Sequence, residues 1–169
     1  IGTDSVYVGY LAGGVGVITG INNTVVGKGA ALNMTSGADN VIIGRGAVGA
    51  GVLAHGSGDT GKYNVVVGDN AGAAMTSAYR NVLIGKSAGS DLTDNHHNIA
   101  IGVNALDAAN TGEHYNIAIG DSALGAETSG ADGCIAIGYA ALSYQNRDSS
   151  SNTAVGHLAL INLNNGVTY

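Results

Sequence analysis

The sequence predicts an all-β chain folded as a parallel β-solenoid of nine coils, each 17–18 residues long. A five-residue phrase that ends in glycine recurs nine times, and an alanine follows each of these glycines by three residues. Successive glycines are 17 or 18 residues apart, with a single step of 24. A fixed period of this size is typical of stacked repeats, in which each unit buries its surface against its neighbours. The glycines are Gly9, Gly27, Gly44, Gly68, Gly85, Gly102, Gly120, Gly138 and Gly156.

Each phrase contains three residues before its glycine, as in Val41-Ile42-Ile43, and all of them are apolar apart from Thr24 and Thr153. β-Branched residues dominate these runs and no helical periodicity surrounds them, so each run predicts a short strand. Alternation places the first and third residues of a strand on one face and the second on the other. Because the third residue is Val or Ile in every coil, we expect it to line the interior of the coil.

The second strand position is also apolar in every coil. A strand that is apolar on both faces is normally covered on both, so we expect this position to contact identical copies of the chain around a shared axis. In the last four coils this position changes to alanine, while the residue after the invariant alanine changes to leucine. The exchange indicates that both side chains share one packed space, which we assign to the interface between chains. The predicted interface residues are Val25, Ile42, Val66, Leu83, Ala100, Ala118, Ala136, Ala154, Leu106, Leu124, Leu142 and Leu160.

The first residue of the phrase is asparagine in seven coils, and Ser5 and Cys134 take this place in the first and eighth coils. In a stack of coils these residues lie one above another, where side-chain amides can bond along the axis. The predicted ladder consists of Asn23, Asn40, Asn64, Asn81, Asn98, Asn116 and Asn152.

The repeats assign residues 1–160 to the solenoid and residues 161–169 to the start of a following connector. The long step predicts an inserted loop at about residues 49–62. Insertions in solenoids lie on one face, often a binding face, so His55, Asp59 and Lys62 are candidate surface-contact residues. A tolerated surface excursion is the alternative interpretation.

Composition excludes several classes of function. The chain has a formal net charge of −6 and only six Lys and Arg, which argues against a nucleic-acid partner. No run of 18 apolar residues is present, so no membrane insertion is expected. The segment from Gly44 to Gly49 matches the dinucleotide-binding pattern G-x-G-x-x-G, but no helical pattern follows it.

The sequence also shows no arrangement of residues that indicates catalysis. The five histidines lack the spacing of metal ligands, although a histidine that meets its own copies on a symmetry axis is an alternative metal site. No nucleophile–base pattern or paired carboxylates recur. We therefore predict no catalytic, cofactor-binding or metal-binding residue, and expect that the chain is not an enzyme.

The segments Asn98 to Leu106, Asn116 to Leu124 and Asn152 to Leu160 resemble the repeats of two families. One is the N-T-A-I-G-x-x-A-L repeat of bacteriophage tail fibres, and the other is the N-S-V-A-I-G repeat in the head domain of trimeric autotransporter adhesins. The adhesin repeat is typically shorter and has Ser where this chain has Ala, so the resemblance favours the tail fibres. It covers about residues 5–160 and implies a homotrimer of left-handed parallel β-rolls on a virion or cell surface.

The resemblance predicts a rigid spacer in a trimeric tail fibre that also contacts the host surface. Its expected partners are further copies of the chain, other fibre or virion proteins, and a host glycan or protein. A bacterial adhesin head that binds host matrix or glycan is the alternative. An ice-binding solenoid requires a regular threonine column, and a β-helical glycosidase or lyase requires clustered acids; neither pattern is present.

Overall fold

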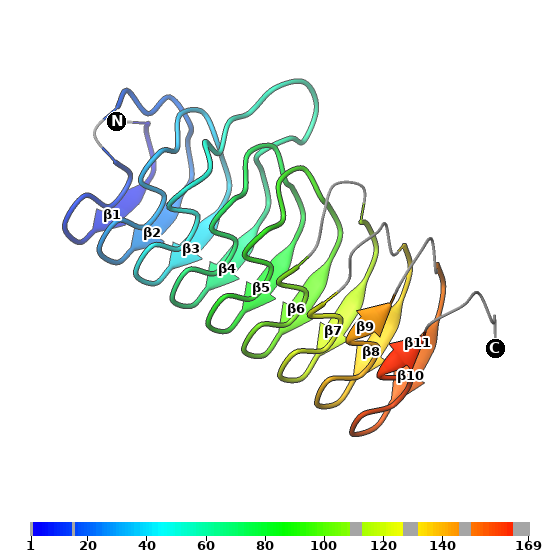
Figure 1. The fold of residues 1–169 in the computed structure, drawn as a ribbon. Coiled ribbons are helices and arrows are strands. Elements are labelled where there is room, and N and C mark those ends of the chain that lie inside the picture. The colour runs from blue at the N-terminus through cyan, green and yellow to red at the C-terminus, as the bar shows by residue number, and fades with distance from the viewer. Residues whose placement is uncertain (1, 15, 109–112, 127–131, 146–149, 164–169) are drawn as a thin grey trace.

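The computed structural model describes residues 2–14, 16–108, 113–126, 132–145 and 150–163. These ranges contain strands and turns and no helix. Nine three-residue strands stack into one parallel sheet, so the chain winds as a β-solenoid with eight turns between its first and last strands (Figure 1). The strands of this sheet are β1 (Val6–Val8), β2 (Thr24–Val26), β3 (Val41–Ile43), β4 (Val65–Val67), β5 (Val82–Ile84), β6 (Ile99–Ile101), β7 (Ile117–Ile119), β8 (Ile135–Ile137) and β10 (Thr153–Val155).

A second, two-stranded sheet forms at the C-terminal end of the stack. β11 (Asn162–Leu163) pairs in parallel with β9 (Tyr144–Gln145). The stacked structure therefore continues past residue 160, where the sequence analysis placed its boundary. Residues 164–169, the rest of the expected connector, lie outside the described residues.

Neighbouring strands pair in the register that the repeat predicts. Leu83 lies opposite Ala100, and Ala100 lies opposite Ala118. The longer step between β3 and β4 leaves this register intact, because the extra residues form a loop that projects from the stack (Figure 1). All pairs of the nine-stranded sheet join successive coils of a single chain, so each chain forms a solenoid of its own.

The interior of each coil is filled by the second strand residue, the invariant alanine and the residue after it. Val25, Ile42 and Leu83 are fully buried, as are Leu106 and its equivalents in the next two coils. The buried side chains of Met34, Leu53, Met75 and Leu92, from the connectors between strands, complete the core.

The predicted orientation of the strands is therefore wrong. The second strand position points into the coil, and the third, expected inside, points outward. The buried asparagine explains the direction: it precedes the second strand residue by two positions, and alternation places both on the same side. The residues assigned to a contact between chains belong instead to the core of one chain: Val25, Ile42, Val66, Leu83, Ala100, Ala118, Ala136, Ala154, Leu106, Leu124 and Leu142 are buried there, and Leu160 packs partly buried against them.

Candidate interaction surfaces

The asparagine column forms a buried hydrogen-bonded ladder along the solenoid. The backbone N–H of Asn64 donates to the Asn40 Oδ1 at 2.9 Å, and the Asn40 Nδ2 donates to the backbone oxygen of Gly61 at 2.9 Å. The same bond between successive coils recurs from Asn23 onward and ends at the backbone N–H of Cys134. Because these amides are buried and satisfy backbone groups, the ladder supports the fold and offers no surface to a ligand.

The outer face of the nine-stranded sheet carries the first and third residues of every strand. We call this set of 18 side chains the outer strip; it consists of Val and Ile, apart from Thr24 and Thr153. The third residues are 36% exposed at Ile43 and 66% exposed at Val155. In one chain, therefore, a mainly apolar surface, with Thr24 and Thr153 as its polar members, runs along the stack from β1 to β10.

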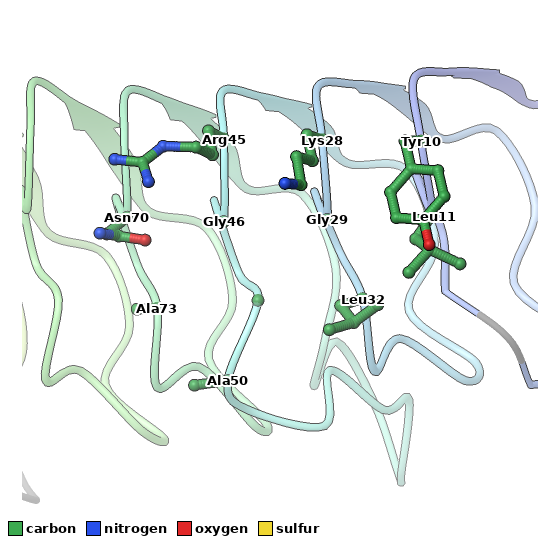
Figure 2. A pocket seen from close by; sticks show the side chains of 11 residues that line it. Tyr10, Leu11, Lys28, Gly29, Leu32, Arg45, Gly46, Ala50, Asn70 and Ala73 are labelled. Atoms are coloured by element: carbon green, nitrogen blue, oxygen red, sulfur yellow. The ribbon is translucent and has the colours of Figure 1, made fainter.

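A groove lies beside the outer strip, over the turns that follow β1 to β4 (Figure 2). It has a volume of about 420 Å³. Tyr10 and Leu11 close one end of it and Asn70 closes the other, while Lys28 and Arg45 lie along its rim. The sequence analysis gave this region no function.

The inserted loop separates the three residues that were predicted to act together. His55 and Lys62 line a shallow depression of about 250 Å³, together with residues of the two preceding coils. Asp59 instead forms an ion pair with Arg80 of the following coil. The loop is also tied to its neighbours by backbone hydrogen bonds, such as that from Ala54 N–H to the Thr76 oxygen at 2.9 Å.

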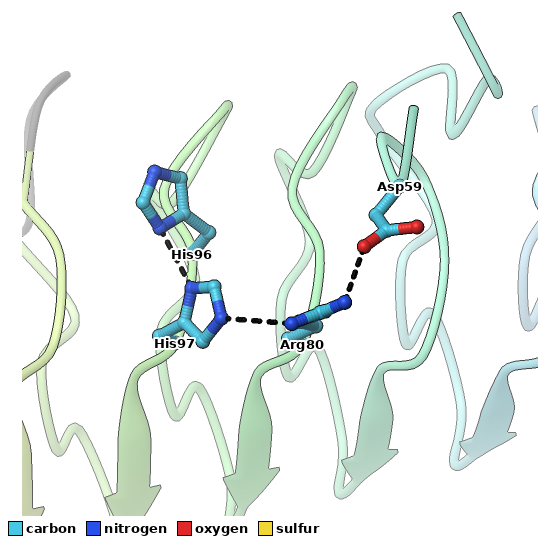
Figure 3. A network of polar contacts seen from close by, with 4 residues as sticks. All are labelled: Asp59, Arg80, His96 and His97. Atoms are coloured by element: carbon cyan, nitrogen blue, oxygen red, sulfur yellow. Dashed lines mark hydrogen bonds and ion pairs between the residues drawn. The ribbon is translucent and has the colours of Figure 1, made fainter. Parts of the chain in front are cut away.

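Histidine and tyrosine side chains form a column on the same side as this loop. The ring of His96 stacks on that of His114 with centroids 3.6 Å apart, and His97 stacks on Tyr115 at 4.9 Å. The Nδ1 atoms of His96 and His97 lie 3.0 Å apart, and Arg80 links His97 to Asp59 (Figure 3). Burial lowers the pKa of His96 below 6.5, and the neighbouring His114 and His97 lower it further.

A second hollow of about 310 Å³ lies over the turns that follow β6, β7, β8 and β10, on the side of the groove. Asp107, Tyr139 and Tyr144 contribute to its lining. Burial raises the pKa of Asp107 from 3.8 to about 6, and the carboxylates of Asp91 and Asp121 act in the same direction.

Among the residues that the structure describes, no group of three or more His, Cys, Asp or Glu side chains has an arrangement that could hold a metal ion. The same residues include no helix with the length and hydrophobicity that a membrane crossing requires. The segment from Gly44 to Gly49 forms the turn after β3, and no helix follows it in the described chain. In comparisons with known proteins, the sequence matches no family model and no curated protein, and the structure matches no solved structure.

Proposed function

We propose that this chain is a structural and adhesive segment of a homotrimeric bacteriophage tail fibre, built from three left-handed β-rolls. The observation that supports this proposal is the outer strip, an apolar surface that a single chain leaves open to solvent. Contiguous apolar surfaces of a few hundred Å² are typical of interaction sites. We expect further copies of the same chain to bury the outer strip, because the strip repeats the same residue types in every coil.

A threefold arrangement fits the shape of the strip. It is only one strand wide and, at about 4.8 Å per coil, about 40 Å long. Around a threefold axis each narrow strip is covered by two neighbours at once. Val and Ile of each layer then meet their own copies at the same height, and the register of the three chains follows from the coil repeat.

The proposed role follows from this assembly. Continuous hydrogen-bonded sheets make the segment a stiff spacer, and the corners of the coils present every surface feature in three copies. Three weak contacts on one rigid body bind a surface more strongly than one does. The segment would then be located on a virion, with other fibre proteins and a host-surface glycan or protein as partners.

The alternative is the head domain of a bacterial trimeric autotransporter adhesin, with the same assembly and a host matrix or glycan as ligand. The flanking gene sequence distinguishes the two. A downstream coiled-coil stalk and membrane anchor favour the adhesin, whereas a self-cleaving chaperone domain favours the tail fibre.

The assembly is tested by the molar mass in solution. We expect three times the chain mass of 16.6 kDa, about 50 kDa, by light scattering or sedimentation. Val67→Lys places a charge in the outer strip and should dissociate the trimer. Val52→Lys is the matched control, because Val52 is exposed in the inserted loop, away from the strip.

Two results would overturn the trimer. One is a stable wild-type chain of 16.6 kDa at concentrations of about 100 μM. The other is a trimer that Val67→Lys and Val52→Lys leave equally intact, because the outer strip would then play no part in assembly.

A further inference from the structure

The groove beside the outer strip exists because two successive coils lack a side chain at one position. This position, two residues after the glycine that ends each strand, is Leu11 in the first coil and Asn70 in the fourth. In the second and third coils it is Gly29 and Gly46, which leave a hollow between Leu11 and Asn70. A Cβ atom added at Gly29 would meet no other atom of the described residues within 4 Å.

The rim of the groove is positively charged in an otherwise acidic chain. Lys28 and Arg45 occupy the same place in adjacent coils, which stack about 4.8 Å apart. Asp69 holds the Arg45 guanidinium at 2.6 Å. The Lys28 ammonium has no hydrogen-bond or ion-pair partner among the described residues. It is therefore available to an external anion.

The remaining lining of the groove is mainly apolar. Leu32, Ala50 and Ala73 lie below the cations, and Leu11 lies at the end of the groove (Figure 2). The ring of Tyr10 beside Leu11 is 70% exposed, so it offers a flat aromatic surface to a ligand. The Asn70 amide adds a hydrogen-bonding group at the opposite end. Apolar walls with a few polar groups at fixed places are typical of small-molecule sites of this volume.

We propose that this groove binds an acidic saccharide. Its carboxylate would pair with Lys28 and with the free side of Arg45, and the C–H face of a sugar ring would pack on Tyr10 and Leu32. A saccharide fits better than a fatty acid, because the groove is open along its length and an acyl chain would stay in water. This inference deepens the surface-contact role proposed above and rests on it.

The binding test uses the assembled wild-type protein and two acidic probes, trigalacturonic acid and 3′-sialyllactose. Each has a neutral counterpart, the methyl ester of its carboxyl groups. Calorimetry should show binding of at least one acidic probe at millimolar concentration. Binding of its neutral counterpart should be about tenfold weaker or undetectable, because a hydrogen bond to a charged group is lost. Added salt should weaken the binding of the acidic probe and leave the binding of its neutral counterpart unchanged.

Three variants locate the site. Lys28→Gln should weaken the binding of the acidic probe about tenfold. Gly29→Asn should abolish binding by filling the hollow, and the fold should tolerate it because Asn70 and Asn104 have the same left-handed backbone at equivalent positions. Lys86→Gln is the control, since Lys86 occupies the same column in the fifth coil, outside the groove, and should not change binding.

The inference is overturned if neither acidic probe binds at about 10 mM, or if acid and neutral counterpart bind equally. Equal loss in Lys28→Gln and Lys86→Gln, or full binding by Gly29→Asn, would also overturn it. The molar mass of each sample is measured alongside. Failure to bind by an intact trimer refutes the saccharide site alone, whereas a monomeric sample refutes the assembly.

Discussion

The glycine at the end of each strand meets two separate constraints. Its φ angle lies between 130° at Gly9 and 150° at Gly68, a region that residues with a side chain rarely adopt. The next coil also passes close above it. A Cβ atom added at Gly102 would lie 2.3 Å from the backbone oxygen of Gly120, and this oxygen cannot move without disturbing the following coil.

These two constraints can be separated by substitution. Gly156 has the same backbone, with φ of 134°, but among the described residues only the Ala159 Cβ lies within 4 Å of its added Cβ. Gly102→Ala should therefore reduce the free energy of unfolding by about 3 kcal/mol or more, from strain and steric overlap together. Gly156→Ala should lose only about 1–2 kcal/mol from strain. Urea denaturation of both variants measures the difference, and equal losses would show that stacking of the coils does not select glycine.

At the scale of one coil, stability depends on how large and small side chains are divided within the core. Leu83 fills the space beside Gly72 and Gly89. A Cβ added at Gly72 would lie 3.1 Å from the Leu83 Cδ1, and one added at Gly89 would lie 2.9 Å from the Leu83 Cδ2 and 2.7 Å from the Leu92 Cδ1. In the next coil the arrangement is reversed, with Ala100 on the strand and Leu106 in the turn. The exchange of volume that the sequence indicates is therefore real, but it occurs inside one chain.

A double-mutant cycle tests this division. Leu83→Ala should lose about 2–5 kcal/mol by leaving a cavity, and Gly89→Leu about 1–3 kcal/mol by overpacking. The double variant should be more stable than the sum of the two losses implies, because Leu83→Ala removes one of the two side chains that Gly89→Leu would meet, although Leu92 stays. Thermal and urea unfolding give the coupling energy. A coupling energy of zero would mean that the two sites do not share one space.

The repeat made the strands of this fold predictable from the sequence. Their predicted orientation was reversed, because the two-residue spacing between the asparagine and the second strand residue was not taken into account. The three-residue strands and their register follow from the spacing of Gly44, Gly68 and the other glycines. The Val or Ile at the third strand position suggested that this position lies in the interior. However, the side chains of Asn40 and Ile42 are two residues apart and lie on the same face, so the buried asparagine shows which face is inside. The asparagine side chain needs hydrogen-bond partners and finds them in the interior of the coil. It therefore indicated the buried face better than the Val or Ile at the third strand position did.

Features that depend on contacts between corners were not predictable in the same way. The groove corresponds to two glycines in the sequence, Gly29 and Gly46. They can be recognised as the floor of a groove only once the turns of successive coils are known to lie side by side. The stacking of His96 on His114 is similar: the residues are 18 positions apart, and only the observed path of the corner brings their rings together.

The whole molecule behaves as a one-dimensional array, because within the described residues each strand contacts only strands of the coil before it and the coil after it. A defect should therefore have different consequences at the end and in the middle of the stack. Asn98 and Asn23 offer a matched pair, since each accepts a bond from the next coil and donates one to a backbone oxygen. Both bonds are lost when either residue is replaced by alanine.

We expect Asn98→Ala to divide the solenoid into two shorter blocks. Unfolding should become less cooperative, and amide hydrogen exchange should accelerate in β5, β6 and β7. Asn23→Ala removes similar bonds, about 1–3 kcal/mol in each case, but should accelerate exchange only in β1, β2 and β3, because its partner Asn40 directly precedes β3. Asn98→Ser is a milder control, because the Ser5 hydroxyl accepts the backbone N–H of Asn23 at 3.0 Å in the first coil. If the two alanine variants loosened the same strands, the coils would be coupled over the full length of the stack, and a nearest-neighbour description would be wrong.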